Sequence, residues 1–199
     1  MALPSPGNGY SPSAAPMTVP SLVHLFRLEV EMCSPTDRIV IPRPMGSSST
    51  RIIMPIIGGK ITGPDIRGNI MPSGGADWAT SLAGSDFARL DARYSIRTDD
   101  NHYISIRSAG TFALPTSPSS SSTPPTDMPT TITQDHIEWF TNITIEAPGA
   151  SPYNHLNSAT AVGCLSQTDS VIFIDVYRLT NFPNSPLRDI FASGAFNKL

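Results

Sequence analysis

The sequence has little charge, little lysine and no clustered basic segment. Charged residues make up 15% of the 199 residues, against roughly 25% in an average domain. Only Lys60 and Lys198 are lysines, the 13 basic residues are scattered, and the net charge is −3. Because nucleic-acid binding needs a concentrated basic surface, we expect no nucleic-acid partner.

Long apolar runs and cysteine pairs are also missing. No stretch approaches the roughly 20 apolar residues that a membrane-spanning helix needs, so we expect no membrane partner. The N-terminus lacks a basic start followed by an apolar stretch, which argues against a secretory signal. Cys33 and Cys164 lie far apart in the sequence. We interpret them as free thiols and expect a cytoplasmic protein.

The familiar motifs of metal, phosphate and nucleophile chemistry are absent. The sequence contains no His-x-x-x-His or Glu-x-x-His pair, no Cys-x-x-Cys and no Gly-x-Ser-x-Gly. Residues 58–63 resemble a phosphate loop only superficially, because the spacing is wrong and no helix is expected to follow. We interpret them as a turn between strands. The sequence therefore gives no reason to expect a metal or another cofactor.

Proline is abundant, with 20 residues, about twice average usage. This frequency argues against an all-helical protein, because an interior proline costs a helix about 3 kcal/mol. Prolines concentrate in two biased segments. We expect residues 1–20 to form a flexible arm and residues 114–131 a low-complexity insertion. One compact domain would span residues 21–180, followed by a C-terminal extension over residues 181–199.

Apolar and polar residues alternate with a period of two, which is typical of strands. The alternation covers residues 22–32, 88–97, 102–107 and 139–146, and residues 170–179 predict a final strand that is apolar on both faces near its middle. Residues 98–101 form a polar connection, so the second and third segments predict a hairpin. The only helical signals are one turn in 77–86 and a short helix in 186–196, with Ser185 as its cap. The pattern predicts an all-β fold, an antiparallel barrel or sandwich.

Three segments carry side chains suited to chemistry. Asp77, beside Trp78 after two glycines, could be a general base near an apolar wall, or could merely hold a turn. Asp91 and Arg93 project to one side of their strand. They are either polar residues that line a ligand cavity or part of a row of charged residues exposed to solvent, a solvated charge ladder. Tyr153, His155 and Asn157 offer donors, acceptors and a proton shuttle, or form a polar loop.

These segments resemble the domain of unknown function 3237 family over roughly residues 22–179. The similarity rests on residues 55–59, 63–64 and 67–68, on 74–78, on 92–100 and on 153–157. The chain departs from the family at Asn101, where glycine is usual, and at His155, where tryptophan is usual. The resemblance implies a barrel similar to those of allene oxide cyclase and dirigent proteins, in which a mainly apolar cavity folds a reactive small molecule.

On this basis we expect a cofactor-independent isomerase or cyclase that acts on an apolar, oxygenated small molecule. The resemblance favours secondary metabolite biosynthesis and an Arg93 that faces the interior. Asp77 would be the acid or base, Arg93 would stabilise an oxyanion, and His155 would donate a proton. The expected substrate-binding residues are Trp78, Tyr94, Tyr103, Tyr153 and Asn157. The alternatives are a lyase or epimerase, a non-catalytic small-molecule binding protein, and a structural homo-oligomer.

Overall fold

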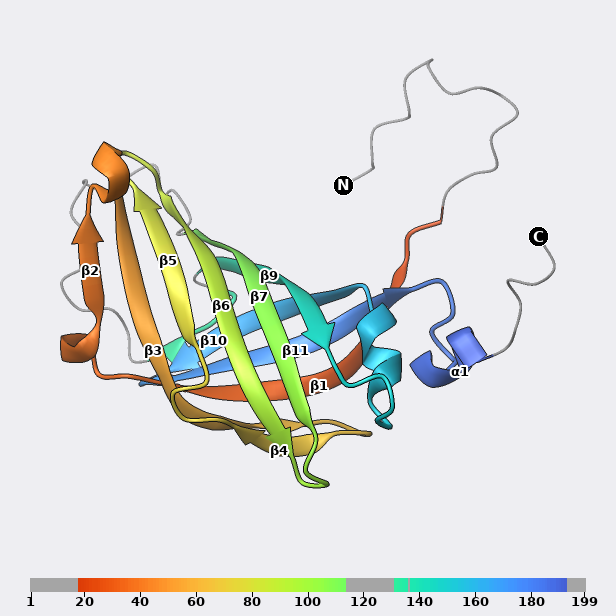
Figure 1. Cartoon of the computed structure of the whole chain (residues 1–199). Helices are drawn as coiled ribbons and strands as arrows, with labels where there is room; N and C mark the ends of the chain where they lie inside the picture. The colour runs from red at the N-terminus through yellow and green to blue at the C-terminus, as the bar shows by residue number, and fades with distance from the viewer. Residues whose placement is uncertain (1–17, 114–130, 136, 193–199) are drawn as a thin grey trace, which may run out of the picture.

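The computed structural model describes residues 18–113, 131–135 and 137–192 (Figure 1). Almost all of the expected N-terminal arm and of the expected insertion therefore lie outside the described residues. Cys33 and Cys164 form no disulfide, so both are free thiols, as the sequence predicted. None of the described helices is long and apolar enough to cross a membrane.

The described chain is built almost entirely from strands. They are β1 (Ser21–Met32), β2 (Ile39–Pro42), β3 (Ser49–Thr62), β4 (Arg67–Ile70), β5 (Ala76–Leu82), β6 (Phe87–Thr98), β7 (Tyr103–Ala113), β8 (Thr131–Ile132), β9 (Glu138–Glu146), β10 (Ala161–Thr168) and β11 (Val171–Thr180). Short 3₁₀ helices are η1 (Pro35–Asp37), η2 (Pro44–Gly46) and η3 (Asn154–Ser158), and the α-helix is α1 (Leu187–Ala192). The expected all-β class and the short C-terminal helix are confirmed.

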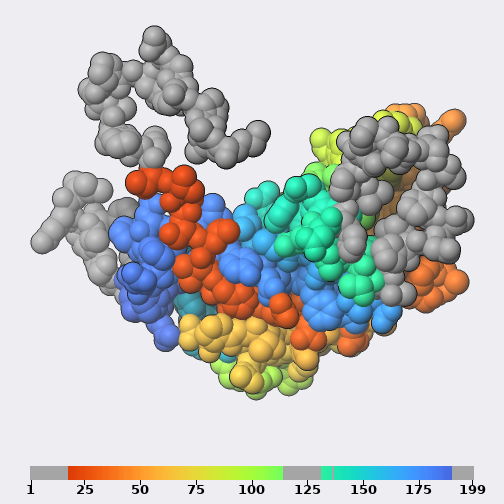
Figure 2. All heavy atoms as spheres, turned by 180° about the vertical axis from the view of Figure 1, so that it is seen from behind, coloured from red at the N-terminus to blue at the C-terminus, as the bar shows by residue number. Residues whose placement is uncertain are grey.

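Antiparallel pairing carries the sheet around into a ring. Six strands follow one another in the order β1-β11-β10-β9-β7-β6. Both β4 and β5 pair with β6 on one side and with β3 on the other. The pairing of β3 with β1 closes the ring. Seen from behind, β1 lies between β11 and the β3–β4 hairpin (Figure 2). The ring has two rims: at the first rim β6 begins and β7 ends, and at the second rim β6 ends and β7 begins.

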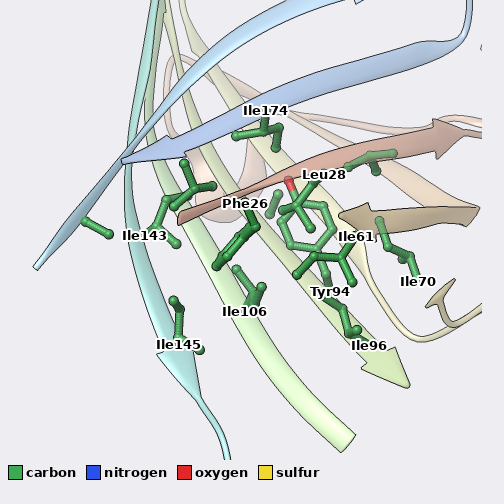
Figure 3. Packing of buried hydrophobic residues seen from close by; sticks show 14 of the residues in the cluster. Phe26, Leu28, Ile61, Ile70, Tyr94, Ile96, Ile106, Ile143, Ile145 and Ile174 are labelled. Atoms are coloured by element: carbon green, nitrogen blue, oxygen red, sulfur yellow. The ribbon is translucent and has the colours of Figure 1, made fainter. Parts of the chain in front are cut away.

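The period of two sorts side chains between the interior and the outer face. Phe26, Leu28 and Val30 of β1 are buried, and Phe26 and Leu28 pair with the inward Val176 and Ile174 of β11. The same interior holds Tyr94 and Ile106 from the far wall (Figure 3). Burial of this continuous apolar cluster is the main force that stabilises the barrel.

Two local expectations are wrong. Gly58 and Gly59 do not form a turn between strands, because β3 continues through them with a register shift against β1. Gly59 has a φ of 130°, and a Cβ there would lie 2.0 Å from the Glu29 carbonyl oxygen, so only glycine allows this approach. The segment expected to form a helical turn begins instead as β5, where residues 76–82 pair with β3.

Candidate active site in the barrel interior

Asp77 lies on the inner face of the barrel, one residue after β5 begins. It pairs with the inward Ala92 of β6 and with Met54 of β3, and it is only 6% exposed. The strand pairing lapses just beyond it, between Asp77↔Ala92 and Thr80↔Arg89. Asp77 Oδ1 accepts a hydrogen bond there from the Asp91 N–H, at 3.2 Å. The sheet thus holds a carboxyl group in place within the apolar interior.

Burial dominates the acidity of Asp77. Desolvation raises its pKa to about 6, and the negative charge of Asp91 acts in the same direction, while the Asp91 N–H opposes the shift. A carboxyl group in this range is partly protonated near neutral pH, so it can both accept and return a proton.

A chain of buried hydroxyl groups lies beside the carboxyl. Tyr94 is 4% exposed, and its pKa is raised by burial and by the charge of Asp77, against a hydrogen bond with Ser108. The Ser108 hydroxyl donates to Thr141 Oγ1 at 2.8 Å. Gly163 leaves the room for this contact, because a Cβ there would lie 2.7 Å from Thr141 Oγ1. The three hydroxyls come from β6, β7 and β9 and supply polar groups in an otherwise apolar space.

The same inner face carries an unused hydrogen-bond donor. Trp139, on β9, packs edge-on against Phe112 with ring centroids 5.1 Å apart. Its Nε1 atom is buried and has no hydrogen-bond partner within the part of the chain that the structure describes. Because an orphaned buried N–H is costly, this donor is suited to an oxygen atom of a bound molecule.

Solvent reaches the interior near the first rim. Met54, Leu90 and Phe112 pack against the core and share its face, yet each is only partly buried. Closer to the second rim, Ile96 of β6 and Ile106 of β7 are fully buried. The inner wall is therefore accessible on the side from which a small molecule could approach Asp77.

The structure does not bring Arg93 to Asp77. Arg93 pairs with Ala76 on the outer face, and its side chain is 61% exposed. Asp91 accepts two hydrogen bonds from Arg107, at 2.7 and 3.0 Å, and lies 4.0 Å from Arg93. These contacts lower the pKa of Asp91. The prediction that Arg93 faces the interior is wrong, because alternation along β6 places Arg93 on the outer face and Tyr94 on the inner face. The structure has the solvated charge ladder instead.

His155 and Tyr153 lie elsewhere, at η3 on the second rim. His155 Nδ1 is 2.9 Å from the Pro152 carbonyl oxygen, and the Tyr153 hydroxyl donates to Asp100 Oδ1 at 2.8 Å. Asn157 accepts from the Ala147 N–H at 2.7 Å and donates to the Ala147 carbonyl at 2.9 Å. Asn157 and Tyr153 thus tie η3 to its surroundings, and neither lies beside Asp77.

The remaining expected substrate-binding residues divide between the two faces. Tyr94 is inside, Trp78 is half-buried on the outer face of β5, and Tyr103 is 59% exposed. Ser108 and Thr141 are the interior groups that sequence reasoning missed. The signal for Thr141 was a hydroxyl on the apolar side of an alternating strand. Among residues 18–113, 131–135 and 137–192, no three His, Cys, Asp or Glu side chains gather as a metal site.

The fold and the interior define an antiparallel, β-barrel-like protein with one carboxyl and several hydroxyl groups buried among apolar side chains. The chain belongs to the family described as protein of unknown function (DUF3237), whose sequence profile matches residues 20–179. The resemblance noted in the sequence is therefore confirmed. A UPF0311 protein of Rhodopseudomonas palustris (strain TIE-1) is 33% identical over 63 residues, which cover 32% of this chain and 40% of that protein.

Solved structures share the fold. A β-barrel-like protein from Acinetobacter baumannii AYE matches with a TM-score of 0.64 and 23% identity, over 83% of this chain and 99% of its own. A protein described as an enzyme from Penicillium herquei matches with a TM-score of 0.59 and 20% identity, over 83% of this chain and 98% of its own. At these identities the similarity establishes the architecture.

Proposed function

We propose that the protein is an enzyme that isomerises or cyclises an apolar, oxygenated small molecule within the barrel. The observation that carries this proposal is the buried Asp77, with a pKa of about 6, beside the Tyr94–Ser108–Thr141 hydroxyl chain. The fold of the Penicillium herquei enzyme supports catalysis in a barrel of this kind. Secondary metabolism and a homo-oligomeric state stay predictions.

The groups suggest a simple proton cycle. The Asp77 carboxylate would remove a proton from a carbon or oxygen atom of the substrate. A hydroxyl group of Tyr94, Ser108 or Thr141 would donate a hydrogen bond to the substrate oxygen that gains negative charge. The protonated Asp77 would then return the proton to a different atom. This cycle leaves the atoms of the substrate unchanged in number, as isomerisation and ring closure require.

The same acid–base groups would also serve a lyase or an epimerase, and a barrel interior that holds a small molecule without converting it would serve a binding protein. Apolar enones, epoxides and phenols are suitable probes, since each joins an apolar body to an oxygen. Mass-resolved chromatography on a chiral column distinguishes the outcomes. A structural isomer and an epimer keep the mass but differ in retention and fragmentation, a lyase product loses mass, and a binding protein leaves the compound unchanged.

Asp77→Asn tests the role of the carboxyl. We expect turnover of a converted probe to fall roughly 10²- to 10⁴-fold, the usual contribution of a general acid–base group. In the wild type, kcat/KM should change with pH near the pKa of about 6, and this limb should be missing from the residual activity of Asp77→Asn.

Asp91→Asn is the matched control, because it removes a carboxylate from the outer face of the neighbouring strand. We expect it to convert the probe at a rate close to that of the wild type, with the pH limb at a lower pH because the charge of Asp91 contributes to the raised pKa of Asp77. Unchanged turnover in Asp77→Asn would overturn the assigned role, and retained binding of probes without conversion would favour the binding protein.

A further inference from the structure

A cavity lies at the second rim, where η3 and the C-terminal segment cover the barrel. Its volume is about 210 Å³, and its walls come from β1, residues 64–66 between β3 and β4, η3 with Tyr153 before it, the end of β11 and residues 183–187. In Figure 1, η3 and α1 lie beside each other at this end. Asp77, Tyr94, Ser108 and Thr141 do not line it, so it is separate from the proposed active site.

Arg178 places a buried guanidinium in the wall of this cavity. It continues the inward row of Ile174 and Val176 on β11 and is 3% exposed. Its Nη1 donates to Thr180 Oγ1 at 3.4 Å, and its Nη2 donates to the carbonyl oxygens of Phe182, at 3.4 Å, and of Ser185. These bonds use three of the five N–H donors of a guanidinium.

No anion compensates this charge within the described part of the chain. The ion pairs found there include none to Arg178, and all three acceptors are neutral. Burial lowers the pKa of Arg178, but a guanidinium stays charged in proteins and cannot escape the cost by losing its proton. A buried cation without a counter-ion is unfavourable, which leaves this position suited to an anionic ligand.

The other polar groups of the wall are already engaged or exposed. Asp65 Oδ1 accepts a hydrogen bond from Arg188 at 3.0 Å, and His24 Nε2 lies 3.5 Å from Asp175. His155 uses Nδ1 at the Pro152 carbonyl. Much of the remaining wall is apolar, from Val23, Phe26, Ile66, Leu156 and Leu187. A carboxylate with a compact apolar body matches one cation surrounded by such a wall.

We propose that this cavity binds a small apolar carboxylate, with its carboxylate oxygens on Arg178 and its body against Phe26, Ile66 and Leu156. Guanidinium and carboxylate match in a two-pronged geometry. The volume is below the roughly 300–1,000 Å³ of sites for drug-sized ligands, which limits the body to about the size of one ring. Asp65 in the wall disfavours a doubly charged phosphate.

Benzoate is the probe, and benzamide is its uncharged counterpart of the same shape. We expect calorimetry or ligand-observed NMR to show saturable binding of benzoate to the wild type, at least tenfold tighter than benzamide. In protein labelled with ¹⁵N, benzoate should shift the Arg178 Nε–H signal. Equal affinities for the two compounds, or no saturable binding of benzoate, would overturn the proposal.

Variants separate this site from the proposed active site. Arg178→Gln should weaken benzoate at least tenfold, while Arg93→Gln, which removes an exposed arginine of the outer face that does not line this cavity, should bind as the wild type does. Asp77→Asn should also retain benzoate binding, so failure of the acid–base role leaves this test intact. If Arg178→Gln does not fold, the comparison of benzoate with benzamide on the wild type still decides the question.

Discussion

Asp77 and Arg178 are both charged side chains buried on the inner face of one barrel, yet they have opposite chemical capacities. Asp77 can become neutral, and burial raises its pKa to about 6, so it can exchange a proton at ordinary pH. Arg178 cannot become neutral in this range and is held by neutral oxygens. The comparison indicates that burial makes one position suited to proton transfer and the other to anion binding.

The layer of fully buried side chains in the barrel should show the largest effect on stability. Ile106 is completely buried, whereas Leu90 on the same inner face is only partly buried. We expect Ile106→Ala to lower the free energy of unfolding by about 2–5 kcal/mol, as deletion of a buried aliphatic side chain usually does. Leu90→Ala should cost less than half as much.

Denaturant titration of both variants measures this difference. If Leu90→Ala costs as much as Ile106→Ala, the interior near the first rim is as tightly packed as the deep core. That result would remove the solvent-accessible approach to Asp77.

The next largest effect is the pH dependence that Asp77 imposes on stability. Its pKa is about 6 in the folded protein and 3.8 as the ordinary value, so the folded state binds the proton more tightly. The resulting stabilisation is complete below pH 3.8 and is lost as the pH rises to about 6. The shift of about two units corresponds to roughly 3 kcal/mol.

Unfolding free energies of wild type and Asp77→Asn, measured across this range, isolate the contribution. We expect the fall with rising pH to be absent from Asp77→Asn. Asp91→Asn is an informative control, because the pKa of Asp91 is lowered and its contribution has the opposite pH dependence. Asp91 stabilises the folded protein at higher pH, and this stabilisation is lost on acidification. Parallel pH profiles for wild type and Asp77→Asn would show that the Asp77 carboxyl is not desolvated.

Alternation in the sequence was enough to predict the strands and most of their faces. It placed Tyr94 and Ile96 on one side of β6 and Arg93 on the other, as the structure has them. The prediction of an interior Arg93 followed the family resemblance and is wrong, because Arg93 is exposed between the buried Ala92 and Tyr94. Charge on the polar side of an alternating strand remains the simpler indication of an outer position.

Contacts between residues that are not neighbours in the sequence account for what the sequence could not show. Asp77 lies on a strand because Gly75 lets β5 approach β6; a Cβ there would lie 1.8 Å from the Arg93 carbonyl oxygen. Ser108 became interior because β7 extends beyond residue 107 and pairs on both sides. Arg178 is buried because carbonyl groups after β11 fold back onto it. None of these partners is adjacent in sequence.

The smallest effect concerns Asn157, a predicted substrate-binding residue that joins η3 to the end of β9. Its amide makes hydrogen bonds with the N–H and carbonyl of Ala147, at 2.7 and 2.9 Å. We expect Asn157→Ala to lower the free energy of unfolding by about 1 kcal/mol, the usual net contribution of such bonds, with turnover unchanged. Asn142→Ala, at an exposed position on β9, is the control in thermal denaturation. If Asn157→Ala left stability unchanged but abolished turnover, the chemistry would have to extend to the second rim, and the separation of the Asp77 and Arg178 sites would fail.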